Sequence, residues 1–132
     1  MSDETQTLQN FINDAYKESR RQPNHATGAL HRLEIELKKG DHPVQEIIVP
    51  SGASLLLYSK DKVRLIFMGK RNRPLFLLEE KSELVLREKL EIYYNTNNVQ
   101  EAMKLMIRAP PSSTVHISNG VKISLFSYKS GS

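Results

Sequence analysis

The stretch LHRLEIELK, residues 30–38, decides the fold class, because its side chains alternate between apolar and charged types. Positions 33, 35 and 37 are apolar, whereas positions 32, 34, 36 and 38 carry a charge. A period of two residues is typical of a β-strand with one buried face and one face in water. The sequence therefore predicts that a sheet begins near residue 30.

Short apolar runs continue downstream, at residues 44–49, 54–58, 62–68, 74–79 and 83–94. Turn-forming residues such as Pro50-Ser51-Gly52 separate them, and this spacing favours a meander of neighbouring strands. Residues 83–94 fit a helical stripe as well as a strand, and we interpret them as a strand.

The last apolar runs, residues 114–118 and 121–127, flank Asn119-Gly120, a dipeptide typical of a β-hairpin turn. We expect a three-residue loop that pairs Ile117 with Val121. A one-residue slip would move half of the apolar side chains to the wrong face of the sheet. The chain is thus expected to end in an antiparallel hairpin.

Two helices are predicted. Residues 4–21 place apolar side chains at helical spacing, with acids at the start and cations at the end, as the helix dipole favours. A second helix is expected over residues 98–108, burying Val99, Ala102, Met103 and Met106.

These elements predict an α+β fold: an antiparallel, β-rich single domain of seven to eight strands, rolled or sandwiched, with the two helices attached. A length of 132 residues suits one domain. We expect residues 1–28 to form the N-terminal helix and linker, residues 29–129 the β-rich domain, and residues 130–132 a tail.

Composition restricts the compartment and the partners. The chain has no cysteine, an acidic and polar N-terminus, and no apolar run of the roughly 18 residues that span a membrane. These features predict an intracellular protein, in cytoplasm or nucleus, with no transmembrane segment. The net charge of +4 leans toward anionic partners.

Motifs that carry chemistry do not occur in the sequence. The four histidines form neither HxH nor HExxH spacing, and there is no GxSxG, SxxK, GxGxxG or GxxxxGK pattern. We therefore expect no catalytic residues, no metal site and no cofactor, and hence a protein that is not an enzyme.

The N-terminal helix is the first candidate surface, through Leu8, Phe11, Ile12 and Tyr16. It either docks on the sheet of its own chain, since a sheet face must be covered, or is offered to a partner or exchanged between protomers. The sequence leaves both readings open.

The loop from Gly69 to Pro74 is the second candidate, because Lys70, Arg71 and Arg73 place three cations within four residues. Arginine gives two-pronged contacts to phosphate and lysine supplies a point charge. The leading hypothesis is a non-enzymatic protein-protein interaction module that self-associates as a homodimer. The alternative is a nucleic-acid-binding domain using this loop, and a third reading directs the same cations to an anionic membrane surface.

Overall fold

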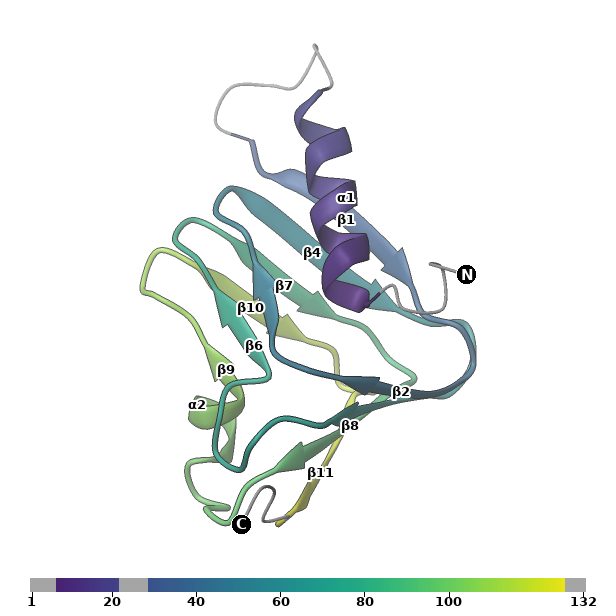
Figure 1. Ribbon diagram of the computed structural model, residues 1–132, viewed down its shortest axis with the longest axis vertical. Coiled ribbons are helices and arrows are strands. Elements are labelled where there is room, and N and C mark those ends of the chain that lie inside the picture. Colours follow the sequence, from purple (N-terminus) through teal and green to yellow (C-terminus); the bar gives the residue numbers. More distant parts are fainter. Residues whose placement is uncertain (1–6, 22–28, 128–132) are drawn as a thin grey trace.

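The computed structural model describes residues 7–21 and 29–127, which wind into a parallel β-solenoid with a helix at one end (Figure 1). Each of the first three circuits of the chain, here called coils, adds one strand to each of three sheets, and the last described coil adds strands to two of them. The first sheet has the order β1 (His31–Glu36), β4 (Ala53–Tyr58), β7 (Glu83–Leu86) and β10 (Thr114–Ile117). The second has the order β11 (Lys122–Phe126), β8 (Leu90–Asn95), β5 (Val63–Phe67) and β2 (Gly40–Val44). The third contains β3 (Ile47–Val49), β6 (Phe76–Leu78) and β9 (Ile107–Arg108).

All the pairings of these eleven strands are parallel, so the predicted antiparallel sheet of seven to eight strands is wrong. The protein remains α+β. Alternation of apolar and charged residues marks a strand and its buried face, but it does not reveal the direction of the neighbouring strand. Here the short connections turn the chain through a corner into the next sheet instead of reversing it.

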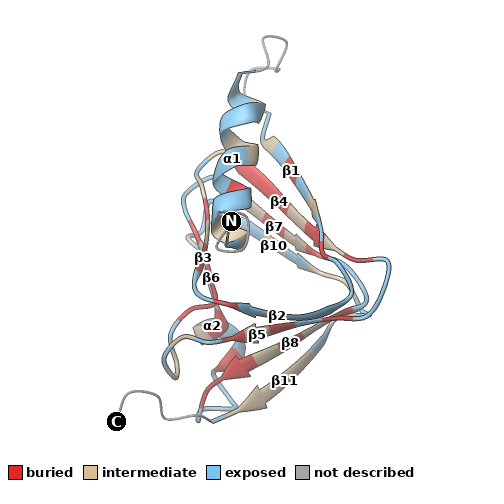
Figure 2. Cartoon of the chain, turned by 45° about the vertical axis from the view of Figure 1, so that its right-hand side comes forward, coloured by how far each residue is buried: buried red, intermediate tan, exposed pale blue. Residues whose placement is uncertain are grey.

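The core is built from side chains that stack in columns from coil to coil. In the first sheet Leu33, Leu55, Leu84 and Val115 share one register position. In the second sheet His42, Leu65, Ile92 and Ile123 share another. The rings of Phe67 and Tyr94 stack beside that column with centroids 5.6 Å apart. Figure 2 shows that the buried residues concentrate in the middle coils, where a coil covers each side.

The predicted hairpin around Asn119-Gly120 is also wrong. Strands β10 and β11 belong to different sheets and pair with β7 and β8 of the preceding coil. The Val121 amide donates to the Ser118 carbonyl at 3.1 Å, which closes a corner between the sheets. Ile117 and Val121 therefore do not pair with each other, although both pack against the common core.

Helix α1 (Leu8–Arg20) confirms the helix predicted over residues 4–21 where the chain is described, and residues 4–6 of that prediction lie outside the described residues. The Thr7 hydroxyl accepts a hydrogen bond from the Asn10 amide at 3.1 Å, which caps the first turn. Lys17 and Arg20 lie in the last turn, where cations interact favourably with the helix dipole. Its apolar side turns toward the solenoid, and Ile12 is completely buried there.

Helix α2 (Ala102–Met106) is much shorter than the predicted helix over residues 98–108. Only Ala102 and Met106 are buried, whereas 72% of Val99 and 45% of Met103 are exposed. A five-residue helix buries one narrow side, and positions i and i+4 fill it. The prediction that Val99 and Met103 are buried is therefore wrong.

Replacing Gly120 with alanine should destabilise the last coil. A Cβ atom at this position would lie 2.4 Å from the Cβ of Glu88, in the coil beneath, and 3.3 Å from its Cα. Backbone must move to relieve such overlap, at a cost of about 1–3 kcal/mol in the free energy of unfolding. Urea denaturation checks this, with the exposed neighbour Asn119→Ala as the control that should change little.

The two methionines of α2 should respond differently to a negative charge. Met106→Asp places an unpaired carboxylate in the core and should cost several kcal/mol. Met103→Asp adds the same group at a half-exposed position and should stay within about 0.5 kcal/mol of the parent. Equal melting temperatures for the two variants would contradict the orientation of the helix.

Candidate interaction surfaces at the two ends of the solenoid

The N-terminal end of the solenoid is closed by α1 along two of its three sheets. The side chain of Gln9 makes two hydrogen bonds to the backbone of Ile48 in β3. Its oxygen accepts from the Ile48 amide at 2.6 Å, and its nitrogen donates to the Ile48 carbonyl at 3.0 Å. The Tyr16 hydroxyl donates to the Ser51 carbonyl at 2.7 Å, and the Ser19 hydroxyl lies 2.9 Å from the imidazole of His31 in β1. The helix thereby pairs the edge of β3 through Gln9, and it bonds to the turn after β3 and to a side chain of β1 through Tyr16 and Ser19.

The four residues of α1 named as a candidate partner surface have separate roles. Ile12 is fully buried, and Leu8 and Tyr16 are half-buried against the first coil. Phe11 keeps 52% of its surface exposed. The helix therefore docks on its own chain, and only Phe11 presents a large apolar surface.

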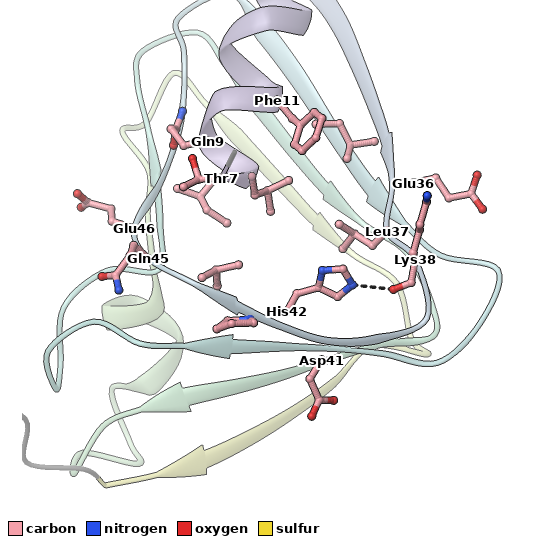
Figure 3. Close-up of a pocket in the computed structure, with 15 residues that line it drawn as sticks. Thr7, Gln9, Phe11, Glu36, Leu37, Lys38, Asp41, His42, Gln45 and Glu46 are labelled. Atoms are coloured by element: carbon pink, nitrogen blue, oxygen red, sulfur yellow. Dashed lines mark hydrogen bonds between the residues drawn. The ribbon is translucent and has the colours of Figure 1, made fainter. Parts of the chain in front are cut away.

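A cavity of about 750 Å³ lies between α1 and the corner that joins β1 to β2 (Figure 3). Phe11 faces it from the helix, Leu37 lines it at the corner, and the His42 ring points into it from β2. Its volume is within the usual range for sites that bind small molecules or peptide segments. The carboxylates of Glu36, Asp41 and Glu46 stand at its rim and point away from its interior.

His42 occupies a column position that apolar residues fill in the other coils. Its Nε2 lies 2.6 Å from the carbonyl oxygen of Lys38. A carbonyl oxygen only accepts hydrogen bonds, so Nε2 carries a proton and donates to it. This imidazole lines the cavity together with apolar side chains and the polar side chains of Thr7, Gln9 and Gln45.

The C-terminal end of the solenoid differs, because β9, β10 and β11 are edge strands among those described. The amides of Thr114 and Ser118 donate to carbonyls of the preceding coil, at 3.1 and 2.9 Å. In a parallel ladder alternate residues direct both N–H and C=O to the same neighbour. The backbone N–H and C=O groups of Val115 and Ile117 in β10 thus point away from the preceding coil, toward the open end.

The same rule applies to β11, where the Phe126 carbonyl accepts the Thr96 amide of β8 at 2.7 Å. Ile123 and Leu125 consequently turn their backbone groups to the open end. Their side chains face the core yet are only half-buried, as are Val115 and Ile117. Figure 2 shows β11 in the intermediate colour beside the buried strand β8.

The structure does not gather the three cations of the basic loop into one site. Arg71 donates to the Ser127 hydroxyl at 3.3 Å. Lys70 and Arg73 line a separate small cavity of about 150 Å³, which Glu46 also lines. The loop is held by Asn72, whose φ of 67° lies in the left-handed region and whose amide donates to the Asn95 carbonyl at 2.9 Å.

Tyr94 anchors this loop from within the core. Its hydroxyl donates to the Arg73 carbonyl at 2.6 Å, and its ring is fully buried. Burial raises the pKa of Tyr94 to about 12, because the phenolate would lose its hydration, while the positive charge of Arg108 partly offsets this. The position of the loop thus depends on a neutral tyrosine.

Known proteins give no guide to these surfaces, because comparisons with family models, curated proteins and solved structures found no match. Within residues 7–21 and 29–127 there is no group of three or more His, Cys, Asp or Glu side chains arranged to hold a metal ion. Neither described helix is long and apolar enough to cross a membrane.

Sequence reasoning missed both the open C-terminal end and the cavity. The apolar residues of 114–118 and 121–127 were recognised, but they were assigned to each other as a hairpin pair.

Stability should fall at alkaline pH through Tyr94. Its pKa is about 12 in the folded state and near 10 when unfolded, so the unfolded chain releases the proton first. The stabilisation is complete below pH 10 and is lost as the pH rises from 10 to 12. Tyr94→Phe should cost about 0.5–1.5 kcal/mol at pH 7, through loss of the hydrogen bond, and weaken this dependence. Urea denaturation at pH 7 to 11.5 measures both effects, and an unchanged alkaline slope in the variant would assign it to other residues.

Proposed function

We propose that this chain is a non-enzymatic protein-interaction module that associates with a second copy of itself through the open C-terminal end. The observation that carries the proposal is the asymmetry of the solenoid. One end is closed by α1, whereas the other displays edge strands over a half-buried core.

Exposed strand edges favour association, because each presents backbone donors and acceptors in a row. At this end Val115, Ile117, Ile123 and Leu125 combine outward-turned backbone groups with apolar side chains that the chain itself does not fully cover. Full burial of such a side chain is worth about 1.5–3 kcal/mol, and because these residues are already mostly buried, about a third of that value or less remains to be gained at each position. A partner laid across the end would supply both the hydrogen bonds and the cover.

Because α1 covers the N-terminal end, the two copies of the proposed dimer would meet through their C-terminal ends. A head-to-tail stack would require β10 of one copy to lie where α1 of the next copy contacts β1. Two C-terminal ends can meet about a two-fold axis, and the strands that face each other there run antiparallel. Such an isologous contact uses the same surface on both copies and closes at two.

The alternative, a nucleic-acid-binding domain that uses residues 70–73, receives less support from the geometry. Arg71 turns toward Ser127, while Lys70 and Arg73 share a cavity lining with Glu46. A carboxylate beside the two cations lowers their attraction for phosphate. We therefore retain self-association as the proposal.

Ile123→Lys should convert the dimer to a monomer. The substitution places a charged amine at the centre of the proposed contact, and a loss of at least 2 kcal/mol would weaken the association constant about 30-fold. Sedimentation equilibrium over a range of concentrations measures the constant. Ile66→Lys tests the effect of a lysine away from the open end, because Ile66 is partly buried on the outward face of β5.

Circular dichroism and thermal melting must show that both variants keep the fold. A monomeric parent at concentrations up to the millimolar range would overturn the proposal. So would a parent dimer that Ile66→Lys dissociates and Ile123→Lys does not.

A further inference from the structure

We infer that the cavity between α1 and β2 is a second binding site, which takes an extended segment of a partner protein with alternating apolar side chains and basic flanks. The site lies at the opposite end of the solenoid from the proposed dimer contact. It is independent of that contact.

The edge of β2 that faces the cavity pairs with no other described strand. The Met68 amide donates to the Val44 carbonyl at 2.8 Å, so Val44 directs its backbone groups to β5, as do His42 and Gly40. The backbone groups of Asp41 and Pro43 point the opposite way, to the side where the cavity lies. Helix α1 covers the corresponding edges of β1 and β3 and leaves this one to the cavity.

The hydrogen-bonding character of this edge specifies an extended backbone. Pro43 has no N–H, so the edge offers two carbonyls, of Asp41 and Pro43, and one amide, of Asp41. An added strand supplies N–H groups at alternate residues, which matches an edge rich in acceptors.

The residues that line the cavity favour apolar side chains in the bound segment. Phe11 and Leu8 face it from the helix, and Ile35, Leu37 and Val44 line it from the first coil. Half of the Phe11 surface is exposed, which leaves apolar area for a ligand to cover. In an added strand every second side chain would enter this apolar space.

The charges at the rim of the cavity favour basic residues on either side of the apolar part of the segment. Glu36, Asp41 and Glu46 carry three negative charges there, against one positive charge on Lys38. Asp41 is partly neutralised by Arg64, which lies 3.8 Å from its carboxylate across exposed surface. A segment with lysine or arginine on either side of its apolar part complements the remaining charge.

The test uses the full chain and a fluorescein-labelled nine-residue peptide in which valine and threonine alternate between terminal lysines. Fluorescence anisotropy should show saturable binding. A peptide with terminal glutamates should bind at least fivefold more weakly. A peptide in which every valine and threonine is N-methylated should lose binding, because it cannot donate to the edge in either strand direction.

Phe11→Glu should weaken binding of the lysine-terminated peptide at least tenfold, because it places a carboxylate in the apolar wall. Met103→Glu, at a similarly exposed position on α2, should leave binding unchanged. The monomerising variant Ile123→Lys should also bind normally, so that failure of the dimer and failure of this site are distinguishable.

Three results would overturn the inference. The first is the absence of peptide binding, including the case in which the cavity takes only a small apolar dye such as anilinonaphthalene sulfonate. The second is binding that Ile123→Lys removes and Phe11→Glu does not, which would place the peptide at the C-terminal edge. The third is dissociation of the dimer by Phe11→Glu, which would make the cavity a contact for the second copy.

Discussion

The parallel hydrogen-bonded ladder between successive coils is the constraint on which the rest of the structure depends. It requires each residue of one coil to lie over a fixed partner in the next, as Leu33 lies over Leu55 and Leu55 over Leu84. Inward side chains are therefore stacked in columns of similar character. Because the ladder extends along the solenoid axis, it leaves an unpaired edge at each end, and both candidate surfaces arise from these edges.

The unpaired strand edges are covered differently at the two ends of the solenoid. At the N-terminal end an amphipathic helix substitutes for a missing coil, and the amide of Gln9 bonds to Ile48 much as a neighbouring strand would. Pro43 leaves the part that the helix does not cover with two carbonyl acceptors and only one amide donor. At the C-terminal end the described chain provides no comparable cover over Val115 and Ile123, which therefore keep outward-turned backbone groups and partly exposed side chains.

Polar side chains stabilise the corners where the chain passes between sheets. Ser82 and Ser113 both donate to the carbonyl of Glu79, at 2.6 and 2.7 Å, which joins successive coils at one corner. At another corner Asn72 accepts the Thr96 hydroxyl at 2.6 Å. The two serine bonds satisfy a backbone carbonyl that leaves the ladder at the turn, whereas the Asn72–Thr96 bond joins two side chains across successive coils. The cavity wall at His42 depends on such a corner, since Lys38 supplies its hydrogen-bond acceptor.

The sequence by itself determined most of the strand segments from residue 30 onward, the N-terminal helix and most of the inward side chains, because two-residue and helical periods are local properties. It missed β2 (Gly40–Val44), which lies mostly outside the predicted runs, and β9 (Ile107–Arg108), which lies within the predicted second helix. It did not determine which strands pair, since alternation is the same in parallel and antiparallel sheets. Only the tertiary structure placed residues 114–118 and 121–127 in different sheets and enclosed the cavity beside His42. The reason is that pairing partners lie a whole coil apart in the chain, as Leu55 and Leu84 do, and no local pattern encodes that separation.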